Sequence, residues 1–179
     1  YQYDQIKYQK SMTRRAAVVN YLEELNIPFE IHEHPPVPTV EEALPYWKDI
    51  DASHCKNLFF RNHKGNRHYL VILDHRRQLN IRDLEQKLKQ GKISFASPER
   101  MERYLGLSAG SVSAFGIIND SENHVHLFID EALQSAERIS FHPNENNATL
   151  VISFPSFLRF LESSGNSYEF IALYDSNDY

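Results

Sequence analysis

The sequence lacks the patterns that mark secreted, membrane-spanning and metal-binding proteins. Its single cysteine excludes an intrachain disulfide framework and is typical of a reducing compartment. It has no apolar run long enough to cross a membrane and no signal or transit peptide pattern. The CxxC, HExxH, GxGxxG, Walker A and GxSxG motifs are all absent. We therefore expect a cytoplasmic protein that is not associated with a membrane.

The net charge of −5 conceals an uneven distribution of charge along the chain. Residues 56–103 contain twelve lysines and arginines against five acidic residues, whereas the remainder contains seven basic and nineteen acidic residues. A chain that concentrates its positive charge in this way can present a basic face to a phosphate backbone. The alternative is that these charges are the solvated faces of helices and hairpins.

Capping residues and apolar spacing predict several helices separated by short strands. The predicted helices start at Thr13, Thr39, Asn80, Ser97 and Ser153 or Ser156. The predicted strands cover residues 28–33, 54–61, 68–74, 117–118, 125–129, 138–141, 148–153 and 168–174. We also expect a loop over residues 45–53, and a buried stripe of Ile81, Leu84 and Leu88 in the third helix.

These elements predict one domain of α+β (mixed α/β) class. A chain of 179 residues can bury one substantial core, so no second domain is needed. We place this domain at residues 13–179, after a polar tail over residues 1–12. About seven strands with four or five helices, without regular βαβ alternation, predict a mixed, barrel-like sheet surrounded by helices.

Lys56 is an anomaly within the predicted strand 54–61. On a period of two it shares an apolar face with Leu58 and Phe60, whereas Asn57 points to the other face. An ammonium group on such a face is costly unless it is paired or used. The side chain therefore either extends to solvent at the edge of the sheet or forms the polar centre of a site.

The histidines and the cysteine offer other chemistry, which the sequence does not favour. The pairs His32/His34 and His124/His126 can each project to one side of a strand, as metal ligands do. Without a metal-binding motif we interpret them as surface or edge histidines. Cys55 faces away from the lysine beside it, so we interpret it as a small core residue.

A loop of small residues, 110–116 (GSVSAFG), completes the set of candidate groups. Small side chains let backbone N–H groups approach a ligand closely. A protonated lysine can hold an ester carbonyl, a developing oxyanion or a phosphate, and a neutral lysine can act as a base. Together with a histidine, these groups suffice to hydrolyse an ester with a bound water.

Three segments in this order resemble the YbaK and prolyl-tRNA-synthetase-associated editing domains. They are residues 54–59 (HCKNLF), the loop 110–116 followed by Asn119-Asp120, and residues 141–143 (FHP) followed by Asn146 and Thr149. The resemblance covers residues 13–174. It is strongest to the free-standing ProX, or PrdX, branch, which deacylates alanine mischarged on proline tRNA.

The resemblance implies roles for individual residues and no metal or other cofactor. The family's catalytic lysine falls on Lys56. Its substrate-binding positions fall on Asn57, Thr39, Gly110, Ser111, Val112, Ser113, Ala114, Phe115, Gly116 and His142. Ala114 stands where the family's loop usually has proline, and the loss of that fixed φ leaves the loop more mobile.

The resemblance also implies a metal-independent aminoacyl-tRNA hydrolase that edits in trans. It would remove alanine from proline tRNA and exclude the prolyl ester because the pyrrolidine ring does not fit. The alternatives are removal of cysteine or another small amino acid such as serine, and a catalytically silent tRNA-binding or regulatory module of the same fold.

The expected partner is mischarged tRNA(Pro), contacted at its acceptor stem and 3′ end, and prolyl-tRNA synthetase is a further candidate partner. We expect a monomer. Phosphate contacts are expected from basic residues of the positively charged third of the chain. These are Arg76, Arg77, Arg82, Lys87 and Lys89.

Overall fold

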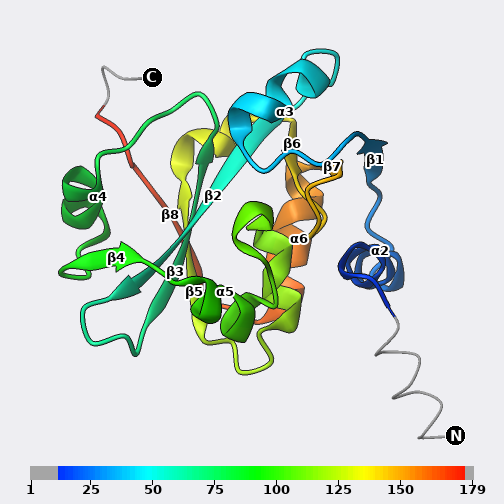
Figure 1. The fold of residues 1–179 in the computed structure, drawn as a ribbon. Coiled ribbons are helices and arrows are strands. Elements are labelled where there is room, and N and C mark those ends of the chain that lie inside the picture. The colour runs from blue at the N-terminus through cyan, green and yellow to red at the C-terminus, as the bar shows by residue number, and fades with distance from the viewer. Residues whose placement is uncertain (1–11, 176–179) are drawn as a thin grey trace, which may run out of the picture.

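The computed structural model describes residues 12–175 as one mixed sheet with helices on both faces (Figure 1). Its strands are β1 (Glu30–Glu33), β2 (Ser53–Asn62), β3 (His68–Asp74), β4 (Ile93–Phe95), β5 (Val125–Asp130), β6 (Arg138–Phe141), β7 (Ala148–Ser153) and β8 (Tyr168–Ile171). Its α-helices are α2 (Arg14–Glu24), α3 (Val40–Trp47), α4 (Ile81–Leu88), α5 (Pro98–Leu105) and α6 (Phe154–Ser164). Three 3-10 helices cover Ala109–Ser111, Ala114–Asn119 and Glu131–Ser135. Except for Met12, the predicted tail lies outside the described residues.

The sheet has the order β1-β7-β6-β2-β3-β5-β8, and β4 pairs with β2 off this path. Pairing is parallel for β2 with β6, β3 with β5 and β5 with β8, and antiparallel elsewhere. The predicted mixed α/β class is confirmed. The predicted barrel-like closure is wrong, because β1 and β8 remain the two ends of the described sheet. The prolines that follow β1 limit it to a short edge strand.

Strand pairing along one edge of β2 is interrupted. One edge of β2 pairs with β3 from Cys55 to Arg61. On the other edge, β6 pairs only with Ser53 and His54, and β4 pairs only from Phe60 onward. Continued pairing of β6 would bring Pro143 against β2, and proline has no N–H to donate. Residues 55–59 therefore have no strand partner on this edge.

The two faces of the sheet bury separate hydrophobic cores. The larger core packs α2, α5 and α6 against side chains that include Phe59 of β2. The smaller core packs Leu84 and Leu88 of α4 against Phe60 and its neighbours. Ile81, predicted to join them, is 37% exposed because it begins the helix, a turn before Leu84 reaches the sheet. None of the helices within residues 12–175 is long and apolar enough to cross a membrane.

Two further local predictions are corrected by the structure, and one strand was missed. Helix α3 continues through Pro45 to Trp47, where a loop was expected. The proline removes one helical hydrogen bond to the solvent-exposed residue Glu41, whereas continuing the helix buries the Trp47 indole. Residues 117–118 lie in a 3-10 helix rather than a strand. The strand β4 was not predicted, since three residues are too few for a periodic signal.

Gly116 is required for close packing of the loop against the end of α5. A Cβ at Gly116 would lie 2.7 Å from Leu107 Cδ1 and 3.1 Å from Leu105 Cβ. We expect Gly116→Ala to lower the free energy of unfolding by about 1–3 kcal/mol in urea titrations. Gly110→Ala is the matched control, because the nearest atoms to its Cβ lie 3.5 Å away. Equal stability of the two variants would contradict this packing role.

Candidate active site

A cavity of about 280 Å³ opens at the unpaired edge of β2. Residues 55–59 of β2 form one wall, and Pro38, Thr39, Val40 and Trp47 line the side formed by α3. The remaining wall comes from Phe95 of β4, Met101 of α5, the loop residues Ala109, Gly110 and Val112, and His142 after β6. The cavity thus joins segments from six separate parts of the chain.

The open edge explains how Lys56 and Asn57, on opposite faces of β2, line the same cavity. Backbone groups of successive residues alternate between the two edges of a strand. The carbonyl of His54 accepts from His75 N on the β3 side, whereas that of Phe59 accepts from Ala96 N on the opposite side. By this alternation the N–H and C=O of Asn57 face the gap, where no strand pairs with them.

Lys56 has an environment that disfavours its charge. Its side chain is half-buried, and burial lowers the pKa of the ammonium, opposed by the charges of Glu41 and Asp74. In the described part of the chain, no hydrogen bond or ion pair engages Nζ. The buried Oδ1 of Asn57 also has no hydrogen-bond partner. A lysine without a partner at a cavity is available to a ligand.

His142 presents a neutral ring to the cavity. Its Nδ1 lies 3.0 Å from the carbonyl of Ala148, which can only accept, so Nδ1 carries the hydrogen and Nε2 is the acceptor. Burial lowers the pKa of His142; the bond to Ala148 opposes this shift, and the nearby ring of His34 adds to it. The imidazole is therefore held in the form that can take up a proton.

Thr149 anchors the α3 side of the cavity. Its hydroxyl accepts a hydrogen bond from Trp47 Nε1 at 3.0 Å and also contacts His34 Nε2 at 2.9 Å. The Trp47 ring stacks on His54 with 4.6 Å between centroids, and His54 Nδ1 is 2.5 Å from Ser140 Oγ. This network holds the indole as a rigid wall of the cavity.

The structure brings together six of the eleven site residues named from the sequence. Those that line the cavity are Lys56, Asn57, Thr39, Gly110, Val112 and His142. The other five are buried behind the cavity wall; they are Ser111, Ser113, Ala114, Phe115 and Gly116. The loop is tied from behind, because Asn146 Nδ2 donates to the Gly110 carbonyl and Asn144 Nδ2 to that of Phe115.

Several residues that line the cavity could not be identified as site residues from the sequence. Trp47 and Met101 come from helices, and Phe95 from a strand that was not predicted. Each has an ordinary aromatic or apolar side chain, whose proximity to Lys56 depends on long-range pairing. An aromatic residue that remains 61% exposed, as Phe95 does, is recognisable only in the folded chain.

The basic residues expected to contact tRNA lie on α4, at its C-cap and on the segment before it, over the smaller core. Arg76 is engaged by Asp74 at 2.9 Å and Lys87 by Asp175 at 2.8 Å. Arg77 lies over the ring of Tyr174, and Arg82 and Lys89 are exposed. No group of side chains within the described ranges has the composition of a metal site.

The family model of the aminoacyl-tRNA editing domain matches residues 34–160. The chain belongs to this family. It is 37% identical to the prolyl-tRNA editing protein ProX of Acetoanaerobium sticklandii over 90% of this chain and 99% of that protein. It is 34% identical to prolyl-tRNA synthetase associated domain-containing protein 1 of Bos taurus, over 85% of this chain and 91% of that one. The resemblance found in the three sequence segments is thus confirmed.

A solved structure shares the editing-domain fold. The crystal structure of a protein proposed as a trans-editing enzyme for prolyl-tRNA synthetase superposes with a TM-score of 0.66 and 19% identity. The match covers 90% of this chain and 99% of that one. All six cavity residues named from the sequence lie within residues 34–160, the part that matches the family.

We expect His142 to titrate below the ordinary histidine pKa of about 6.5 in NMR spectra of the folded protein. As the pH falls through 6.5, the unfolded chain then takes up the proton first. Its contribution to the free energy of unfolding is present above that pH and is lost as the pH falls toward the folded-state pKa. His142→Asn should weaken the loss of stability between pH 7 and 5. A folded-state pKa of 6.5 or higher would contradict the assignment.

Proposed function

We propose that this protein is a trans-editing aminoacyl-tRNA deacylase that hydrolyses the ester of alanine mischarged on proline tRNA. The observation that carries the proposal is an unpaired, half-buried Lys56 at a small cavity, beside a neutral histidine and unpaired backbone groups. These are the groups that ester hydrolysis by water requires. Membership of the editing family and the names of the relatives support tRNA as the carrier of the ester.

The lysine and the strand edge are proposed to bind the reacting carbonyl. The Lys56 ammonium and the Asn57 N–H donate to the carbonyl oxygen, and both interactions strengthen as that oxygen gains negative charge. The Asn57 carbonyl, which faces the gap, accepts from the substrate's α-ammonium group. The Asn57 N–H is fixed by the strand and requires no reorganisation during the reaction.

His142 is proposed to act as the general base. Its Nε2 takes a proton from the attacking water while the water oxygen bonds to the carbonyl carbon. The protonated ring then donates that proton to the ribose oxygen as the ester C–O bond breaks. The products are free alanine and a tRNA with an intact 3′ hydroxyl, and the pathway uses only protein groups and water.

The walls of the cavity are proposed to select for a small side chain. Met101, Val112 and Trp47 surround a space of about 280 Å³, which must hold both the amino acid and part of the ribose. The prolyl ring is larger than the alanyl methyl group and would clash with the Trp47 indole, which is held in place. Steric exclusion of this kind discriminates strongly against larger substrates and weakly among small ones, so cysteine and serine are the relevant competitors.

We expect Lys56→Ala to lower kcat/KM for Ala-tRNA(Pro) by about 10²–10³-fold, the usual effect of losing one oxyanion donor. The assay follows ester loss from Ala-, Cys-, Ser- and Pro-tRNA(Pro). Lys48→Ala is the matched control, because Lys48 is an exposed lysine at the end of α3. If no charged tRNA loses its ester, the deacylase proposal is wrong and a catalytically silent tRNA-binding module is the remaining alternative. If Lys56→Ala keeps full activity, the role proposed for Lys56 is wrong.

Phe95 is proposed to stack on the terminal adenine base at the mouth of the cavity. Its ring is 61% exposed and is itself stacked on Phe60, with 4.6 Å between centroids. We expect Phe95→Ala to raise KM for Ala-tRNA(Pro) by about 5–150-fold, in keeping with 1–3 kcal/mol per stacked base. Phe95→Tyr keeps the stacking surface and should preserve KM. An unchanged KM in Phe95→Ala would contradict the stacking role.

A further inference from the structure

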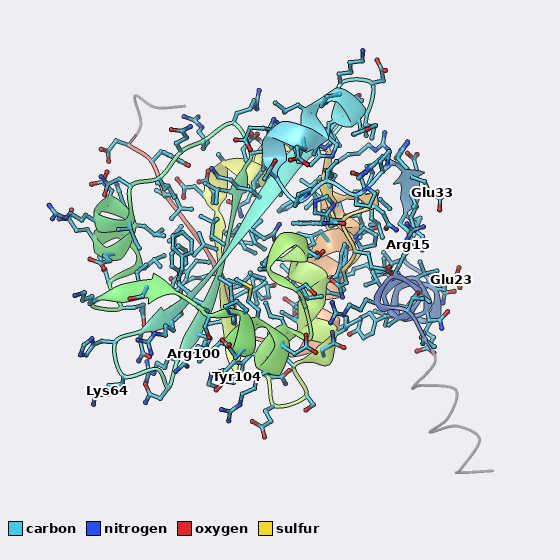
Figure 2. All side chains as sticks on the ribbon, viewed as in Figure 1. Arg15, Glu23, Glu33, Lys64, Arg100 and Tyr104 are labelled. Atoms are coloured by element: carbon cyan, nitrogen blue, oxygen red, sulfur yellow. The ribbon has the colours of Figure 1, made fainter. Side chains whose placement is uncertain are left out.

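Two guanidinium groups converge on the turn that joins β2 to β3. A Cβ placed on Gly65 would lie 2.8 Å from Arg100 Nη2 and 3.0 Å from Arg61 Nη1. The two positive groups are therefore within about 6 Å of each other, a distance at which like charges repel. Figure 2 shows Lys64, Arg100 and Tyr104 near one another at this end of the molecule.

No acidic side chain neutralises this pair. Other arginines of the protein have carboxylate partners; for example, Arg15 pairs with Glu33 and Arg138 with Glu30, both at 2.6 Å. By contrast, no carboxylate among residues 12–175 forms an ion pair with Arg61 or Arg100. Arg103, which lies over the ring of Tyr104, adds to the same local charge. An uncompensated cluster of cations is a site for an anion.

Arg100 is held in place by bonds that leave one end of its guanidinium open. Its Nη1 donates to the Gly65 carbonyl at 2.9 Å and to His68 Nε2 at 3.0 Å. Since arginine only donates, His68 Nε2 is the acceptor, and the Nδ1–H of this buried ring donates to His124 Nε2 at 2.9 Å. Burial, His124 and the nearby arginines lower the pKa of His68 to about 4, so it stays an acceptor. Nη2 makes no hydrogen bond within the described residues and lies, like Arg61 Nη1, beside Gly65.

We propose that Arg61 and Arg100 form a binding site for a phosphodiester group of the tRNA strand that leads out of the cavity. Two guanidinium forks can each donate to the unesterified oxygens of one phosphate, which also removes the repulsion between them. Gly65 keeps the space between the forks free, since any side chain there would meet both. The choice of tRNA as the source of the phosphate rests on the proposed function.

The position of the site relative to the cavity fits a continuous strand. Arg61 follows Asn57 by four residues on β2 and lies on the same face. At the rise of an extended strand this separation is about 13 Å. Stacked nucleotides advance by about 3.4 Å each, so a strand whose 3′ end occupies the cavity passes Arg61 within a few nucleotides. Phe95 pairs with Phe60, one residue before Arg61 in β2, and stacks on its ring on the opposite face of that strand.

The test compares two esters in the full-length protein. We expect Arg61→Gln and Arg100→Gln each to lower kcat/KM for Ala-tRNA(Pro) by about tenfold or more, mainly through KM. Hydrolysis of alanyl-adenosine, which has no phosphate, should be unchanged. Binding of uncharged tRNA should weaken, and the slope of log affinity against log salt should fall by about one for each arginine. Arg159→Gln, an exposed arginine of α6, is the matched control.

The outcomes separate this site from the proposed activity and from misfolding. Arg61 makes no side-chain hydrogen bond within the described structure, so Arg61→Gln tests the site even if Arg100→Gln disturbs the turn. Unchanged tRNA affinity and salt slope in Arg61→Gln would overturn the proposal. Competition by inorganic phosphate that the variants abolish, without any loss of tRNA affinity, would assign the site to free phosphate and also overturn it. If no ester is hydrolysed but tRNA binding still depends on both arginines, the site stands and the deacylase proposal fails.

Discussion

The missing strand partner along residues 55–59 of β2 is the constraint on which the site depends. Strand β6 leaves the sheet before His142 and Pro143, and β4 joins only at Phe60. The gap between them is wide enough for a cavity and lets side chains from both faces of β2 reach it. The same departure of β6 places His142 at the rim, where the Ala148 carbonyl orients its ring. One interruption of the sheet thus positions the lysine, the strand edge and the histidine together.

The positively charged side chains at the two ends of β2 have different surroundings. Near the gap, Lys56 stands alone on an apolar wall, and burial lowers its pKa. At the turn, Arg61 and Arg100 lie together without a carboxylate partner among the described residues, and burial, His124 and these arginines lower the pKa of His68. A single cation in a small cavity suits a carbonyl that gains charge during a reaction, whereas a pair suits a group that is always charged. The proposed phosphate site uses two of the twelve basic residues in this third of the chain.

Local patterns predicted the elements well and their long-range pairing poorly. Thr13, Ser97 and Ser153 cap helices as expected, because capping is decided by residues within one turn. The openness of the sheet and the gap in β2 depend on which strands meet, and periodicity carries no information on that. Lys56 was recognisable because its charge contradicts its strand position. Phe95 was not, since its exposure exists only after β4 has paired.

In the loop that contains Ala114, hydrogen bonds and packing provide restraints in place of the fixed φ of a proline. Proline at this position would fix φ, and its absence led us to expect a more mobile loop. In the structure Ala114 is fully buried, and Ser113 Oγ accepts from the N–H of Phe115. Asn144 Nδ2 donates to the Phe115 carbonyl from the segment after β6, and Gly116 packs directly on the end of α5. Because these contacts fix the loop from behind, the cavity wall at Gly110 can remain in place without the ring of a proline.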